Sequence, residues 1–195
     1  MNVTVLGAGG RTGRGVVAEA LVRGHEVTAV VRRPPDLPLD PAARTVTGDA
    51  RDAAALAQAL EGSDAVLSAM GPAGEDPGTV YSEAIAALVA AMEASGPARL
   101  VITANSWVFG DDSLTGPYAG VSREHRRALA RLRASRLDWT VVATPMLTDD
   151  APAAGYSAIV DATEGGTIDR VDFARAVVDT LEHDEWIGHA VEVTA

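Results

Sequence analysis

A glycine-rich run near the start of the chain has the residue types and spacing of a phosphate-binding loop. Residues 7–13 follow an apolar stretch with strand character and precede a stretch with helical spacing. Glycines at such a junction allow a tight turn and let backbone amides at a helix N-terminus approach an anion. The G-x-x-G-x-x-G spacing in this context predicts a dinucleotide-binding loop. The loop residues expected at the ligand are Gly7, Gly9, Gly10, Arg11, Thr12 and Gly13.

Two arginines directly after the second apolar run indicate which dinucleotide is bound. Sites that prefer NAD usually place an acidic residue here, about 20 residues beyond the loop, to bind the ribose 2′-hydroxyl. Arg32 and Arg33 occupy this position, and guanidinium groups suit a 2′-phosphate. The first 33 residues carry five Arg and two acidic residues, although the whole chain has a net charge of −11. We therefore predict NADP(H) as the cofactor; the alternative is a pair of solvated loop arginines.

The elements that must position these residues alternate along the chain. Short apolar runs expected to be strands are separated by stretches of helical spacing, which is typical of βαβ units and a parallel sheet. Strands are expected at 3–6, 26–31, 44–47, 65–68, 100–103, 139–143 and 190–194, and helices at 12–23, 53–60, 80–95, 122–135 and 171–181. The pattern predicts one Rossmann-type α/β domain over residues 1–195, with a doubly wound parallel sheet in the order 3-2-1-4-5-6 and a short final strand.

Composition excludes several kinds of chemistry. The 195 residues include no Cys, and all 16 basic residues are Arg, so thiol nucleophiles, thiolate metal sites, Schiff bases and a Walker A loop are absent. The negative net charge argues against nucleic acid, and no apolar run reaches the roughly 18 residues of a membrane span.

We expect a cytoplasmic protein that binds a small-molecule substrate and no metal, with Asp149 and Asp150 facing water. The Ala-rich helix expected at 80–95 could pack in a homodimer.

The motifs together resemble a known family. Residues 7–13 and the run from His25 to Pro34 look like the atypical short-chain dehydrogenase/reductase group. More narrowly, they resemble the small NAD(P)H-binding, NmrA-like proteins and the flavin/biliverdin-IXβ reductases. The runs Gly48–Ala50, Ser68–Gly71 and Ile168–Ala174 add to this resemblance, which covers nearly the whole chain.

The resemblance implies further contacts with the cofactor at the carboxyl ends of the strands. It places residues 49–50 at the adenine, residues 68–71 at the ribose and diphosphate, and residues after the fifth and sixth strands near the nicotinamide. The residues implied are Asp49, Ala50, Ser68, Ala69, Met70, Gly71, Thr103, Asn105, Thr144, Pro145 and Met146.

The catalytic candidates depart from the family's common pattern. Typical members use Tyr-x-x-x-Lys, but Ser122 stands four residues after Tyr118 and the chain has no lysine. Ser106 lies next to the position at which the small flavin reductases place a serine. His125 is a candidate proton donor or substrate contact, although the charged residues around it favour a surface histidine. The candidates are therefore Ser106, Tyr118 and His125.

Three functions are compatible with these residues. The first is an NADPH-dependent reductase of a flavin, quinone or enone, with substrate enclosed by residues 71–78, 107–118 and a lid at 148–166. The second is a non-catalytic NADP(H) sensor of the NmrA-like type, because the Tyr/Lys pair is missing. A sugar-nucleotide epimerase is the weakest, since that class needs the lysine and a longer C-terminal portion.

Overall fold

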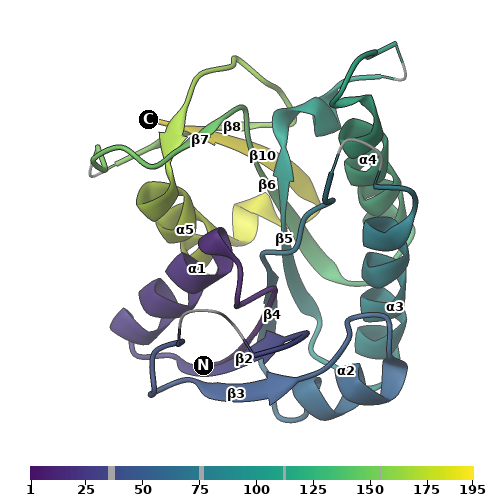
Figure 1. Ribbon diagram of the computed structural model, residues 1–195, viewed down its shortest axis with the longest axis vertical. Coiled ribbons are helices and arrows are strands. Elements are labelled where there is room, and N and C mark those ends of the chain that lie inside the picture. Colours follow the sequence, from purple (N-terminus) through teal and green to yellow (C-terminus); the bar gives the residue numbers. More distant parts are fainter. Residues whose placement is uncertain (35–37, 75–76, 112, 154) are drawn as a thin grey trace.

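The computed structural model describes residues 1–34, 38–74, 77–111, 113–153 and 155–195, and its centre is an eight-stranded sheet (Figure 1). Seven strands are parallel, and β8 pairs with β10 in the antiparallel sense at one edge. In spatial order the strands are β3 (Arg44–Thr47), β2 (Glu26–Val31), β1 (Asn2–Leu6), β4 (Ala65–Ser68), β5 (Arg99–Asn105), β6 (Asp138–Thr144), β10 (His189–Thr194) and β8 (Ser157–Val160). The expected order 3-2-1-4-5-6 is confirmed.

Helices cover both faces of the sheet, as Figure 1 shows. One layer holds α1 (Arg11–Val22) and α5 (Arg170–Asp179), which pack against each other. The other layer holds α2 (Ala53–Leu60), α3 (Val80–Ser95) and α4 (Ala119–Arg133). Short 3-10 helices, η1 and η2, span Ser106–Phe109 and Asp184–Trp186, and a separate pair of strands joins β7 (Leu147–Thr148) to β9 (Ile168–Asp169).

The central strands are apolar on both faces because each face is buried. Along β5, Leu100 and Ile102 pack with α2, α3 and α4, whereas Val101 packs with α1 and α5. All three side chains are at most 1% exposed. A strand buried on both sides has no polar face, so continuous runs of Val, Leu, Ile and Ala identify the parallel strands in the sequence.

The helix layer of α1 and α5 is held by small residues. A Cβ atom built on Gly15 would lie 3.0 Å from the Cβ of Ala174, so the two helices approach closely at this point. The first turn of α5 is fixed by Asp169, whose carboxylate accepts a hydrogen bond from the Val171 amide at 2.7 Å. As a result, the beginning of α5 lies beside the beginning of α1.

The segment expected to be a lid, residues 148–166, is partly built into the sheet. It contains β8, which pairs with β10 over residues 157–160. Its run Ser-Ala-Ile-Val lies in a stretch rich in Pro and Gly that carries no clear pattern, and it becomes a strand because β10 offers an unpaired edge. The expectation of a lid over this whole segment was therefore wrong. Each of the three expected substrate loops also contains positions outside the described residues: 75–76, 112 and 154.

The topology has its switch point between β1 and β4, which is where open α/β sheets form a ligand-binding crevice. The chain winds outward from β1 through β2 to β3 and then returns to the other side of β1 at β4. At such a switch point the loops after the two strands diverge, which opens space outside their carboxyl ends. The glycine loop follows β1 at this point. In the described residues no helix is long and apolar enough to span a membrane.

Candidate dinucleotide site

Two glycines of the motif, Gly10 and Gly13, converge on the carbonyl oxygen of the first, Gly7. Gly7 has φ +72°, a conformation that favours glycine, and the Gly10 amide donates a hydrogen bond to the Gly7 carbonyl at 3.0 Å. A Cβ on Gly13 would lie 2.2 Å from the same oxygen, and a Cβ on Gly7 would lie 3.0 Å from the backbone of Ala69. The loop therefore folds tightly against the end of β4 and allows no side chain at these positions.

The loop ends at the exposed N-terminus of α1. No described side chain caps this helix, and its first turn contains no acidic residue. The amides of Arg11, Thr12 and Gly13 have no acceptor within the helix, and with the helix dipole they favour an anion. The residues present thus fit the diphosphate of a dinucleotide. Arg11 is exposed and pairs with Asp149.

The two arginines after β2 are exposed at the edge of this crevice. Nearby, Asp49 accepts two hydrogen bonds from the Arg51 guanidinium, at 2.8 and 3.1 Å. These bonds, with a backbone bond and the positive charges of Arg51 and Arg32, lower the pKa of Asp49 to about 2. The expected acceptor for an adenine amino group is therefore already engaged by Arg51. The positive charge of Arg32 lies close enough to Asp49 to help lower the pKa of its carboxyl group.

Hydrogen bonds and strand pairing connect the predicted residues at the ends of β4, β5 and β6. Ser68 is fully buried, and its hydroxyl has no hydrogen-bond partner among the described residues. The Thr103 hydroxyl donates to the Met70 carbonyl at 3.4 Å, which ties the end of β5 to the loop after β4. Asn105 lies opposite Thr144 in the register of β5 and β6. Pro145 follows half-buried, and Met146 is 60% exposed.

His125 is a core histidine and not the surface histidine that its charged neighbours favoured. Its ring is 5% exposed and meets the edge of Tyr81, with ring centroids 5.3 Å apart. Nδ1 lies 3.1 Å from Oδ1 of Asn105. The helical spacing of α4 turns its arginines outward and turns His125 toward β5, which explains the error. Burial lowers the pKa of His125 to about 4, so the imidazole is neutral at pH 7 and holds Asn105 in place.

Ser106, the second catalytic candidate, lies beside a buried carboxylate that the sequence did not single out. Glu192 of β10 is 1% exposed and accepts hydrogen bonds from the Thr163 hydroxyl at 2.5 Å and the Glu164 amide at 2.8 Å. Burial raises its pKa, but these donors and the nearby Ser106 hydroxyl outweigh burial and lower it. The Ser106 hydroxyl forms no hydrogen bond of normal geometry in the described structure.

Tyr118, the third candidate, lies at the surface. It is 56% exposed, and its ring packs against Trp107 at a centroid distance of 4.6 Å. The two rings form an aromatic surface next to Ser106 in the chain. The structure thus separates the three candidates: His125 is buried under β5, Ser106 is buried at its end, and Tyr118 faces solvent.

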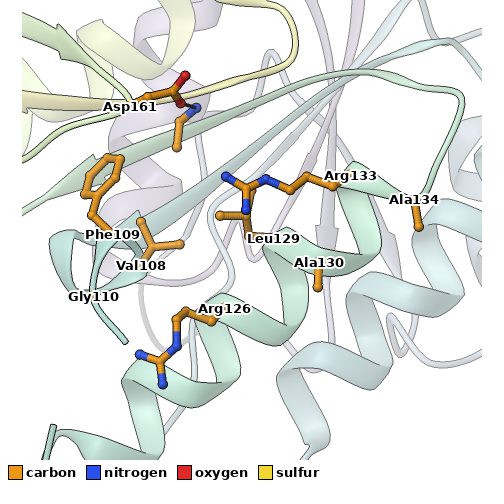
Figure 2. Close-up of a pocket in the computed structure, with 10 residues that line it drawn as sticks. Val108, Phe109, Gly110, Arg126, Leu129, Ala130, Arg133, Ala134 and Asp161 are labelled. Carbon is orange, nitrogen blue, oxygen red and sulfur yellow. Dashed lines mark hydrogen bonds between the residues drawn. The ribbon is translucent and has the colours of Figure 1, made fainter. Parts of the chain in front are cut away.

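A cavity of about 540 Å³ lies elsewhere, between α4 and the edge of β10 (Figure 2). Its apolar lining includes Val108, Phe109 and Leu129. Figure 2 shows the Arg133 side chain extending toward Asp161, with Arg126 at the opposite end. Phe109 therefore lines this cavity, and none of the residues expected at the cofactor is among those that line it.

The buried histidine makes stability depend on pH. Between about pH 6.5 and 4 the unfolded chain binds a proton at His125 that the folded chain does not, so stability falls as pH falls through this range. A shift from 6.5 to about 4 corresponds to about 3 kcal/mol. We predict that the free energy of unfolding, measured with denaturant, falls between pH 7 and pH 4 by this amount more in the wild type than in His125→Gln. A His125 imidazole that titrates near pH 6.5 by NMR would contradict the assignment.

Comparison with known proteins identifies the family. The model of a family described as NAD(P)H-binding matches residues 7–184. YwnB of Bacillus subtilis is 28% identical over 95% of this chain and 94% of its own. An uncharacterized protein of Mycobacterium tuberculosis is 33% identical over 105 residues, and this match covers 54% of the chain but only 12% of that much longer protein.

Solved structures share the whole fold. A protein of Burkholderia pseudomallei is 26% identical, with a TM-score of 0.85 and full coverage of both chains. SP1627 of Streptococcus pneumoniae, assigned as an NADH-flavin reductase, has a TM-score of 0.85 at 22% identity and covers 100% of this chain and 99% of its own. A short-chain dehydrogenase/reductase of Veillonella parvula in complex with NADP has a TM-score of 0.79 at 19% identity. The match covers 100% of this chain and 94% of that one. This chain therefore belongs to the NAD(P)H-binding family.

Proposed function

We propose that the protein is an NADPH-dependent reductase of a small flat or carbonyl-bearing molecule, such as a flavin, quinone or enone. The observation that carries the proposal is the position of Arg32 and Arg33. Both are exposed at the end of β2, beside a glycine loop whose geometry suits a diphosphate. A 2′-phosphate at this point would gain two guanidinium groups, and the nearby carboxylate of Asp49 is already paired with Arg51.

The chain's own residues bind and orient, and the bound nicotinamide supplies the hydride. Asn105, fixed by the buried His125, and Thr144 lie side by side at the strand ends where the nicotinamide end of the cofactor is expected. Trp107 and Tyr118 offer an aromatic surface for a flat substrate. Reduction also consumes one proton. Since His125 is neutral and the chain has no lysine, we assign this proton to water or to the Ser106 hydroxyl, re-protonated from solvent.

A dinucleotide sensor is the second candidate, and one observation favours it. The three polar groups expected to transfer protons are a neutral buried imidazole, a buried hydroxyl and an exposed phenol, and none of these is an evident proton donor to a substrate. A sensor needs no such group. It would bind NADPH and NADP⁺ with different consequences for a partner and would not consume NADPH.

Binding specificity tests the assignment of the arginines. Replacing both Arg32 and Arg33 with Ala removes the charge-assisted hydrogen bonds to the 2′-phosphate. Bonds to charged groups are worth about 1.5–3 kcal/mol, so we predict that NADPH binds about 10- to 100-fold more weakly and that NADH binding is unchanged. Titration followed by nicotinamide fluorescence measures both. Arg123→Ala, an exposed arginine on α4, is the matched control. Equal affinities of the wild type for NADPH and NADH would remove the role given to the arginines.

Turnover separates reductase from sensor. With FMN, a quinone or an enone as acceptor, we predict loss of the 340 nm absorbance of NADPH with a matching gain of reduced acceptor. Ser106→Ala should lower kcat and leave the affinity for NADPH unchanged, because we assign this hydroxyl to the substrate and not to the cofactor. Tight NADPH binding with no acceptor-dependent oxidation across these three classes would favour the sensor.

A further inference from the structure

Asp149 joins the segment after β7 to the first turn of α1. One carboxylate oxygen, Oδ2, accepts a hydrogen bond from the Arg11 guanidinium, and Oδ1 accepts one from Nε of Arg170 at 2.8 Å. Nη1 of Arg170 also donates to the Thr12 hydroxyl at 2.9 Å. Arg11 and Thr12 are the first two residues of α1, directly after the glycine loop. One carboxylate is thus held by two guanidinium groups, one from the first residue of α1 and one from the first residue of α5.

The parts of this arrangement differ in how firmly they are held. The Arg170 side chain is 18% exposed, and Arg170 opens α5, whose packing against α1 at Gly15 fixes the spacing of the two helices. The side chains of Arg11 and Asp149 are 70% and 59% exposed. Arg170 is therefore a fixed cation over the glycine loop, while Asp149 can leave at little cost, since exposed ion pairs contribute little to stability.

The charges around Asp149 are those that a phosphate would need. Hydrogen bonds from Arg170 and Arg11 lower the pKa of Asp149, so it is a full anion at neutral pH. An arginine presents paired donors to phosphate as well as to carboxylate, and the uncapped N-terminus of α1 favours either anion. A dinucleotide diphosphate carries two negative charges against one on the carboxylate, so it competes well for the same donors.

We infer that Asp149 is an internal competitor of the cofactor: it occupies Arg11 and Arg170 in the free protein, and the dinucleotide diphosphate takes both guanidinium groups from it. This rests on the proposed dinucleotide function. It adds Arg170 as a diphosphate-binding residue and makes release of the segment after β7 a consequence of cofactor binding. Because the diphosphate is common to both cofactors, the competition acts equally on NADPH and NADH, unlike the pair Arg32 and Arg33.

Two variants with a matched control test the inference by calorimetric titration with NADPH and with NADH. Asp149→Asn keeps the shape of the side chain and removes the competing charge, so both cofactors should bind about three- to fivefold more tightly. Arg170→Ala should weaken both by about tenfold. Asp150→Asn, the exposed neighbour, should bind as the wild type does. Unchanged unfolding midpoints would show that all three variants are folded.

The outcomes separate this inference from the proposed function. If wild type binds NADPH but Asp149→Asn binds equally well or more weakly, Asp149 does not compete and the inference is overturned while the dinucleotide site stands. A loss in Arg170→Ala for NADPH alone would place Arg170 at the 2′-phosphate and would also overturn it. If neither dinucleotide binds to any variant or to the wild type, the proposed function fails and the inference with it.

Discussion

The approach of Gly10 and Gly13 to the carbonyl oxygen of Gly7 is the constraint on which the site depends. The Gly7 carbonyl accepts the Gly10 amide, and Gly13 lies so close to it that no other residue fits. This contact fixes the turn from β1 to α1 against the backbone that follows β4, and it leaves the first turn of α1 uncapped at the switch point of the sheet. The order of the strands then decides which other residues can reach that point, because parallel strands all end at the same edge of the sheet.

The second consequence of the fold is the burial of polar groups under that edge. His125 and Asn105 contact each other beneath the end of β5, and Glu192 is held by the loop that precedes β9. These groups are satisfied within the protein and fix the geometry of the strand ends. Chemistry at such a site depends mainly on positioning a reactive cofactor and its acceptor, since the buried histidine and carboxylate described here are both engaged by other groups of the protein.

The sequence predicted the fold and the dinucleotide loop because both follow from local patterns. The apolar runs buried on two faces mark the parallel strands, and the glycine spacing marks the turn from β1 to α1. The error at His125 had a clear cause. Six arginines lie on α4 or just beyond its end, and they made the whole helix look solvated in the sequence. Only the packing of α4 against β5 shows that the histidine faces inward.

Contacts between distant parts of the chain were beyond the reach of local patterns. Asp149 and Arg11 are 138 residues apart, and Arg170 and Thr12 are 158 apart. Neither pair has a spacing rule that links it, so Asp149 was expected to face water. The strand β8 was missed for a related reason, because a four-residue run becomes a strand only when a partner edge such as β10 is available.

Amide NMR with NADP⁺ tests most directly whether the dinucleotide binds across the glycine loop. We expect the largest chemical-shift changes at Arg11, Thr12 and Gly13, with smaller ones at Met70 and Gly71 and little change around the cavity lined by Leu129 and Arg133. Changes centred on that cavity, with the amides of the first turn of α1 unmoved, would contradict it.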